Sequence, residues 1–214
     1  MTELFAMPVH CIDPDDRTLR ACLSPARLER LDRLHGTARA QSFAASLLLE
    51  HAVRCLFPSV PHPLESAAQP DGKPYLIGAP QVQFNLSHAG DWAVCAVGSH
   101  PVGVDIEQCR AGRRDVARRF FHPDEVQYLD TLSPAARTDA FYTLWTLKES
   151  YVKADGRGLR LLRHFCVDLS GAPRVAGDET ASLFRIDFPD PDYRLSLCVR
   201  QKNAAPPPLT LLHR

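Results

Sequence analysis

The segment Val102–Glu107 (VGVDIE) carries two carboxylates in a pattern typical of a β-strand. Side chains alternate along a strand, so Gly103, Asp105 and Glu107 face one way and the three aliphatic residues face the other. The two carboxylates lie about 7 Å apart at Cα, close enough to converge on one cation. Oxygen donors of this kind suit Mg²⁺. The alternative is a half-buried edge strand with solvated acidic side chains.

A second charged segment, LWTLKESYVKADGRGL, has the spacing of a helix. Glu149 and Lys153 stand four residues apart and share one helix face, with Lys148 beside them. Glu149 would supply a third oxygen ligand, while the two lysines would offer positive charge to phosphate oxygens. Carboxylates around a metal with flanking lysines suit a pyrophosphate substrate. The alternative is a surface ion pair, which contributes little to stability.

Two shorter motifs add polar groups that an anion or an adenine could meet. In DGKPYL, the Asp-Gly pair predicts a turn that presents Lys73 and the rigid Pro74. In FNLSHAG, Ser87 and His88 end a predicted strand. A plain loop and a core or turn histidine are the alternatives. The motifs GxxxxGKS/T, GxGxxG and GxSxG are absent from the sequence, which argues against P-loop and Rossmann nucleotide sites.

The composition narrows the class of protein. The chain has 214 residues, of which 45% are hydrophobic and 23% charged, as in ordinary globular domains. The 25 basic residues balance the 25 acidic ones, so a duplex-binding surface and a nucleic-acid partner are not expected. No apolar run approaches a membrane span, and the N-terminus does not resemble a secretory signal, so a cytoplasmic location is expected. The seven scattered cysteines predict reduced thiols rather than a disulfide framework or a structural zinc site.

These residues must be positioned by alternating groups of helices and strands. Ser24 and Pro25 predict a helix start, and a helix is expected over 37–57 before a Pro-rich loop. The runs 82–87, 92–98 and 102–107 predict an antiparallel meander with tight turns.

The second half restarts with predicted helices. These cover 113–120, 123–132 and 134–155, the last with an apolar stripe at helical spacing that Gly156 ends. Strands near 164–169, 182–188 and 193–200 precede a segment, AAPPPLTLLHR, that is expected to be loosely held. Helices followed by strands therefore occur twice. The sequence predicts an α+β fold of two similar halves, 1–100 and 101–214.

Taken in order, GKP, FNLSHAGDW, GVDIE, RFFHPDE and WTLKESYVKADGRGL resemble the Sfp-type 4'-phosphopantetheinyl transferases, over about residues 24–170. The resemblance implies a pseudo-twofold monomer of two α+β halves, with coenzyme A and Mg²⁺ in a cleft between them. It implies an N-terminal half (1–100) that binds coenzyme A and a C-terminal half (101–214) that binds metal and is catalytic. The implied reaction is transfer of the phosphopantetheine arm of coenzyme A to a serine of an apo carrier protein, with release of adenosine 3',5'-bisphosphate.

The same resemblance implies a role for each matched residue. The magnesium ligands would be Asp105, Glu107 and Glu149. The coenzyme A contacts would be Arg27, Arg30, Lys73, Pro74, Ser87, His88, Lys148 and Lys153. Glu125, in FHPDE, matches a family glutamate near the metal, so either Glu125 or Glu149 would take the proton of the carrier serine. Lys153, with Lys148, would stabilise charge on the pyrophosphate.

One position departs from the family pattern. Relatives have an arginine that opens the second helix and contacts coenzyme A, where this chain has Ser42. Arg39, Arg27 or Arg30 is expected to compensate.

Two other functions stay open: a non-catalytic coenzyme A-binding module and a magnesium-dependent hydrolase of nucleotide pyrophosphates. The pathway of the carrier protein is not encoded in these motifs. Because the net charge is zero, an acidic carrier would have to dock on a local patch, and the basic run Arg110, Arg113, Arg114, Arg118 and Arg119 is the candidate.

Overall fold

The computed structural model describes residues 1–110, 114–156 and 158–212, and the chain divides into two compact units. The first unit comprises Met1–Pro101 and the C-terminal segment from Pro207, and the second comprises Val102–Pro206. Each unit contains helices and strands, so the predicted α+β class is confirmed. Among the described residues, no helix is long and apolar enough to cross a membrane.

A four-stranded sheet in the order β11-β1-β5-β4 forms the centre of the first unit. Its strands are β1 (Thr2–Pro8), β4 (Gln83–Ala89), β5 (Trp92–Gly98) and β11 (Leu209–Leu211). β5 pairs antiparallel with β1 and β4, whereas β11 pairs parallel with β1. The expectation of a loosely held C-terminal segment is therefore wrong, because its backbone hydrogen-bonds to a sheet edge of the first unit.

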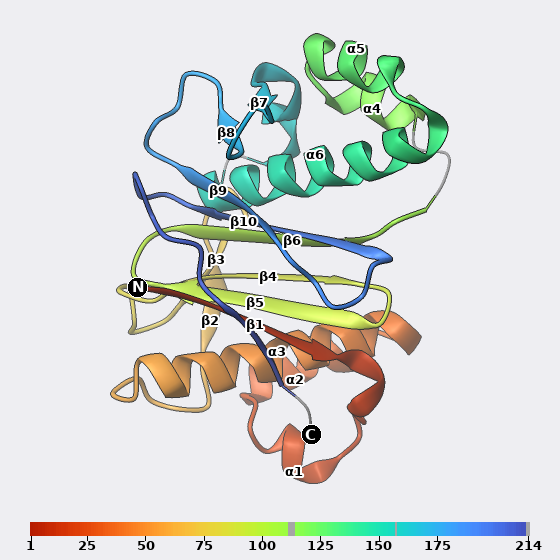
Figure 1. Cartoon of the computed structure of the whole chain (residues 1–214). Helices are drawn as coiled ribbons and strands as arrows, with labels where there is room; N and C mark the ends of the chain where they lie inside the picture. The colour runs from red at the N-terminus through yellow and green to blue at the C-terminus, as the bar shows by residue number, and fades with distance from the viewer. Residues whose placement is uncertain (111–113, 157, 213–214) are drawn as a thin grey trace. The chain divides into compact units, whose positions relative to one another are not determined.

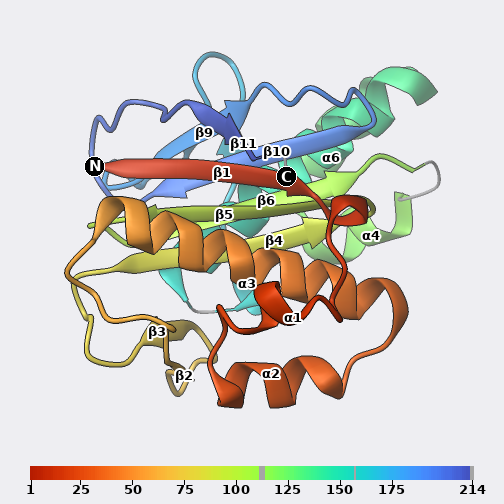
Figure 2. The same ribbon diagram turned by 90° about the horizontal axis from the view of Figure 1, so that it is seen from below.

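One long helix, α3 (Gly36–Leu56), crosses a face of this sheet (Figure 2). Its apolar side chains, among them Phe43, Leu48 and Val53, join Phe84 and Cys95 of the sheet in one hydrophobic core. The helix occupies nearly the predicted range, 37–57. The remaining elements of the unit are η1 (Val9–Cys11), α1 (Arg17–Arg20), α2 (Pro25–Asp32), β2 (Ser66–Ala68) and β3 (Pro74–Leu76).

The second unit repeats the plan with a three-stranded antiparallel sheet in the order β6-β10-β9. These strands are β6 (Val102–Gln108), β9 (Ser182–Ile186) and β10 (Tyr193–Val199). The predicted meander is wrong in its third strand, because β6 pairs with β10 and not with β5. An alternating pattern identifies a strand but not the partner to which its backbone hydrogen-bonds.

The helix α6 (Pro134–Asp155) crosses one face of that sheet (Figure 1). The predicted stripe of Ala140, Leu144, Leu147, Tyr151 and Ala154 is buried in the core of the unit, as expected. The helix ends at Gly156, whose φ of 81° suits a glycine cap. The other elements are α4 (Arg114–Phe120), α5 (Pro123–Thr131), η2 (Leu159–His164), β7 (Val167–Asp168) and β8 (Arg174–Val175).

A glycine on β6 sets how closely α6 approaches the sheet. A Cβ on Gly103 would lie 2.0 Å from the carbonyl oxygen of Ser150 and 2.4 Å from the backbone nitrogen of Ala154. Any side chain at this position would push the helix away from the strand. The close approach brings the charged end of α6 against the face of β6 that carries Asp105 and Glu107.

Candidate active site

Two carboxylates from β6 and one from α6 form the charged centre of the second unit. Asp105 and Glu149 are buried, and Glu107, nearer the end of its strand, is half-buried. The predicted alternation of β6 is confirmed, since Gly103 faces α6 and Asp105 follows it by two positions on the same face. Gly103 is the residue whose importance the sequence reasoning missed. A glycine inside an otherwise aliphatic strand was the available signal.

Lys153 ties the helix to the strand at this centre. Its Nζ lies 2.5 Å from Oδ1 of Asp105 and donates a second hydrogen bond, of 3.2 Å, to the carbonyl of Val104. The Lys153 side chain keeps about a quarter of its surface exposed, at 28%, whereas that of Asp105 is only 6% exposed. The lysine thus compensates a buried carboxylate while part of it stays open to solvent.

The environment of Glu149 favours its protonated form. Burial, together with the nearby Asp105 and Glu107, raises the pKa of its carboxyl to about 7, while Lys153 opposes them. The carboxylates of Asp105 and Glu107 thus act electrostatically on Glu149 across the contact of β6 and α6. The set of three carboxylates supplies only oxygen donors, which fits Mg²⁺ better than a softer metal.

Trp145 hydrogen-bonds one of these carboxylates. Its indole Nε1 donates to Oε1 of Glu107 at 3.3 Å, and its ring stacks on Phe141 with a centroid distance of 5.9 Å. Phe120 meets the same indole edge-on. Packing fixes the orientation of the indole, which in turn restricts Glu107.

The variant Trp145→Phe is expected to weaken Mg²⁺ binding roughly tenfold, because it keeps an aromatic ring in the packing but removes the N–H donor together with part of the indole. The loss of folding stability should stay near about 1 kcal/mol. Magnesium titration followed by thermal unfolding measures both quantities. In a Glu107→Gln background the same substitution should have little further effect on magnesium affinity, and an equal loss there would contradict a role through Glu107.

Lys148 and Glu125 lie elsewhere, in a buried ion pair. Lys148 Nζ is 2.9 Å from Oε2 of Glu125, and the two side chains are 0% and 2% exposed. Lys148 also donates to the carbonyl of Phe165 at 2.6 Å and lies over the ring of that residue. Oε1 of Glu125 accepts the backbone N–H of Val167. Burial lowers the pKa of Lys148, and Glu125 opposes that effect.

The roles that the sequence predicts for these two residues, Lys148 at the pyrophosphate and Glu125 near the metal, stay predictions. In this structure Lys148 binds a carboxylate and a carbonyl. Glu125 accepts hydrogen bonds from the start of α5, from β7 and from Lys148. The pair joins α5 and the segment before β7 to α6. Consecutive positions on a helix face different ways, which separates Lys148 from Glu149.

The predicted coenzyme A residues of the first unit lie on three elements. Ser87 is buried and His88 is exposed, both on β4. Lys73 is half-buried just before β3, which begins at the exposed Pro74. Backbone N–H of Lys73 donates to Asp71 Oδ1 at 3.1 Å, as the turn prediction requires. The exposed Arg30 lies on α2.

Arg27 occupies the place that the departure at Ser42 leaves open. Its guanidinium donates to Oγ of Ser42 at 2.9 Å and to Oγ of Ser46 at 2.7 Å. Burial, with Arg30 nearby, lowers the pKa of Arg27. Arg39 forms ion pairs with Asp15 at 2.7 Å and Asp32 at 3.2 Å. Of the candidates for compensation, Arg27 is anchored on Ser42 itself, whereas the charge of Arg39 is paired with two carboxylates.

The chain is similar to known proteins over most of its length. Residues 101–198 match the model of the 4'-phosphopantetheinyl transferase superfamily. A 4'-phosphopantetheinyl transferase of Bacillus subtilis is 36% identical over 86% of this chain and 84% of its own length. The transferase Sfp of Bacillus subtilis strain 168 is 30% identical, over 82% of this chain and 81% of its own. The transferase psf-1 of Bacillus pumilus is 34% identical, over 77% of this chain and 73% of its own length.

Proposed function

This chain belongs to the 4'-phosphopantetheinyl transferase superfamily, and we propose that it transfers the 4'-phosphopantetheine arm of coenzyme A to a serine of an apo carrier protein. The observation that carries the proposal is the cluster of Asp105, Glu107 and Glu149 with Lys153 across the contact of β6 and α6. The proposal includes Mg²⁺ as the metal, coenzyme A as co-substrate, a cytoplasmic location and a monomeric enzyme.

In the proposed reaction, the hydroxyl oxygen of the carrier serine attacks the β-phosphorus of coenzyme A. Its proton passes to the carboxylate of Glu149, and the bond to the adenosine 3',5'-bisphosphate leaving group breaks. In the metal-free protein the pKa of this carboxyl is raised, and bound Mg²⁺ would keep it ionised and so able to accept a proton. Bound Mg²⁺ would neutralise charge on the pyrophosphate, held by Asp105, Glu107 and Glu149.

Lys153 has two tasks in this mechanism. It compensates the buried Asp105, and its partly exposed ammonium offers positive charge to the pyrophosphate as the bond breaks. In the first unit, the proposal assigns Arg27, Arg30, Lys73, Ser87 and His88 to the nucleotide portion of coenzyme A. A guanidinium forms the strongest of such contacts with a phosphate.

We propose that the carrier protein docks on the basic residues of α4 and of the segment before it. Arg118 and Arg119 are exposed on that helix, and Arg110 is exposed just after β6. Arg113 lies outside the described residues, as does the side chain of Arg114. Charges of this kind act mainly on the rate of association and on its salt dependence.

The deciding experiment mixes the protein with coenzyme A, Mg²⁺ and an apo carrier protein and follows the carrier by mass. A gain of the phosphopantetheine mass that requires the carrier supports the transferase. Cleavage of coenzyme A without a carrier would instead identify a hydrolase of nucleotide pyrophosphates. Binding of coenzyme A with neither product would identify a non-catalytic module.

The raised pKa of Glu149 predicts how metal binding depends on pH. Below about pH 7 the folded protein holds a proton on Glu149 that Mg²⁺ must displace, so the affinity should fall about tenfold per pH unit. The unfolded chain releases this proton near its ordinary pKa. In the metal-free protein, the proton on Glu149 therefore stabilises the folded state at low pH. This contribution to the free energy of unfolding is lost as the pH rises through about 7.

Thermal unfolding with and without Mg²⁺ at about pH 6 and about pH 8 measures this effect. The magnesium-induced shift of the midpoint should be much larger at the higher pH. Glu149→Gln is the matched control, in which the pH dependence should disappear. An equal shift at both pH values in the wild type would contradict the assignment.

Arg27→Ala is expected to narrow the preference for coenzyme A over its 3'-dephospho form. A guanidinium contact with phosphate contributes about 1.5–3 kcal/mol, so the ratio of the two kcat/KM values should fall roughly 10- to 100-fold. Arg39→Ala is the control. Because the guanidinium of Arg39 is bound to Asp15 and Asp32, this substitution should leave the ratio of the two kcat/KM values unchanged. A ratio that moves in the Arg39 variant alone would reverse the two assignments.

A further inference from the structure

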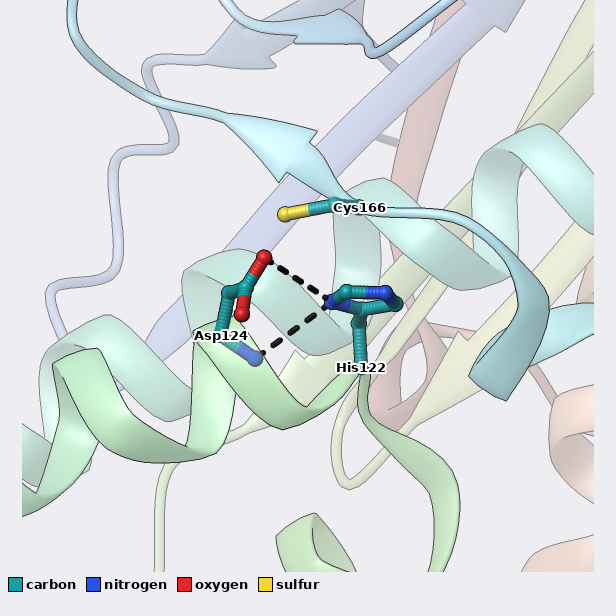
Figure 3. A group of neighbouring side chains, drawn as sticks. All are labelled: His122, Asp124 and Cys166. Atoms are coloured by element: carbon teal, nitrogen blue, oxygen red, sulfur yellow. Dashed lines mark hydrogen bonds and ion pairs between the residues drawn. The ribbon is translucent and has the colours of Figure 1, made fainter.

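A second group of metal-ligating side chains lies in the second unit, at the start of α5. It consists of His122, Asp124 and Cys166, which offer one nitrogen, one oxygen and one sulfur (Figure 3). All three atoms lie within 4.8 Å of one another. His122 and Asp124 come from the first turn of the helix, and Cys166 comes from the segment just before β7. The charged centre on β6 and α6 uses none of these residues.

Each donor atom is only weakly committed to other contacts. Nδ1 of His122 accepts the backbone N–H of Asp124 at 3.3 Å, a long hydrogen bond, and lies 3.4 Å from a carboxylate oxygen of that residue. The Asp124 side chain is 76% exposed. The thiol of Cys166 has a weak contact of 3.8 Å with the carbonyl of Val167. A bound cation would therefore replace only these weak contacts.

The histidine already has the tautomer that a metal needs. Because Nδ1 accepts a hydrogen bond from a backbone N–H, the neutral ring carries its proton on Nε2. The lone pair of Nδ1 faces this N–H, so a bound cation would take the place of this long hydrogen bond. The start of α5 does not depend on this one bond, because the Glu125 side chain accepts the backbone N–H of His122 at 2.9 Å.

The surrounding charges favour a cation. Burial raises the pKa of the Cys166 thiol most, the carboxylates of Glu125, Asp124 and Asp168 raise it further, and Lys148 opposes them. Lys148 neutralises Glu125 and Arg174 pairs with Asp168, so Asp124 is the negative charge at the site that these cations leave uncompensated. Cys166 and Asp124 also line a cavity of about 460 Å³, which has room for a further ligand such as water.

We propose that His122, Asp124 and Cys166 form a binding site for a soft divalent cation such as Zn²⁺, with water as the fourth ligand. A nitrogen, a sulfur and a carboxylate oxygen are the ligands that Zn²⁺ takes, at about 2.0–2.3 Å. Tetrahedral geometry then needs ligand atoms about 3.5 Å apart. Nδ1 of His122 and a carboxylate oxygen of Asp124 are already 3.4 Å apart, so the remaining approach, of up to about 1 Å, is that of the Cys166 sulfur. On binding, the Cys166 thiol releases its proton to solvent and a zinc–sulfur bond forms.

The three-carboxylate centre is a different kind of site. Its ligands are oxygens only, which select a hard cation, whereas a thiolate selects a soft one. A single probe can therefore distinguish the two, provided that it reports a metal–sulfur bond.

The experiment titrates Co²⁺ into the full-length protein after treatment with a chelator, and records absorption. Cobalt bound to a thiolate gives a charge-transfer band in the near ultraviolet, which Zn²⁺ should then abolish by displacement. Cys166→Ser should remove the band. Asp124→Asn and His122→Gln should weaken cobalt binding by at least about tenfold, and these two variants keep the test informative if Cys166→Ser fails to fold.

Cys55→Ser is the matched control. Cys55 is exposed on α3 with its sulfur 3.6 Å from Nε2 of His51, so it offers a nitrogen and a sulfur without a third ligand. The band should persist in this variant and in Asp105→Asn. Absence of the band in the wild type, its persistence in Cys166→Ser, or its loss in Cys55→Ser would each overturn the proposal.

Discussion

Replacing Glu149 with Gln is expected to lower kcat/KM for transfer of the phosphopantetheine arm by at least about a hundredfold and to leave the fold intact. Gln has the size of Glu and can accept the same hydrogen bonds. It cannot take the proton of the carrier serine, and it removes one negative charge from the proposed metal site. The loss should appear in kcat as well as in KM for coenzyme A.

Stability should change in the opposite direction. Glu149 is buried near Asp105 and Glu107, so its ionised form is disfavoured in the folded protein without metal. At about pH 8 the metal-free Glu149→Gln protein is therefore expected to be at least as stable as the wild type. A variant that loses activity without losing stability has lost function rather than packing.

Glu179→Gln is the matched control for this experiment. Glu179 lies in the same unit, is largely exposed and pairs with Lys202 at 2.9 Å, so its replacement should alter neither activity nor fold. Full transferase activity in a folded Glu149→Gln protein would show that another group takes the proton, and the mechanism proposed for this centre would have to be abandoned.

The parts of this centre that could be predicted from sequence are those fixed by local periodicity. Alternation along β6 places Asp105 and Glu107 on one face, and helical spacing places Glu149 and Lys153 on one face of α6. Neither pattern says that the two faces meet. That contact depends on Gly103, where the backbone of α6 occupies the space of a side chain.

Helical spacing does not predict the ion-pair partners of these cations. Lys148 and Lys153 are both lysines of one helix, yet one is buried against Glu125 and the other pairs with Asp105. Spacing alone gives no distance to Glu125, which is 23 residues away. The partners of Arg39 were hidden for the same reason, since Asp15 and Asp32 approach it from outside its own helix.

The pairing of strands that are not neighbours in the sequence could not be predicted from the sequence either. The hairpin of β4 and β5 follows from two neighbouring runs and a short turn at Gly90. The pairing of β6 with β10 joins residues whose separation in the sequence is nearly the length of the second unit. The pairing of β11 with β1 joins the two ends of the chain. Such partners are selected by the packing of whole units, which no short motif contains.

Lys148→Met is expected to destabilise the fold by about 3–5 kcal/mol, the largest stability effect predicted for this chain. The methionine would fill most of the volume of the lysine. It would leave the carboxylate of Glu125 buried, with its backbone donors but without a countercharge. Urea unfolding measures the free energy directly. Arg174→Met is the matched control, because Arg174 also pairs with a carboxylate, that of Asp168, but is 70% exposed. Its replacement should lower the free energy of unfolding by no more than about 1 kcal/mol.

A double-mutant cycle then separates the charge pair from simple packing. Glu125→Gln should destabilise the wild type, because it leaves the buried ammonium of Lys148 without a countercharge. In the Lys148→Met background the same change should be stabilising, since it removes an unpaired buried charge while its amide oxygen still accepts the N–H of Val167. If Lys148→Met instead left stability unchanged and raised KM for coenzyme A, Lys148 would face the pyrophosphate and not Glu125.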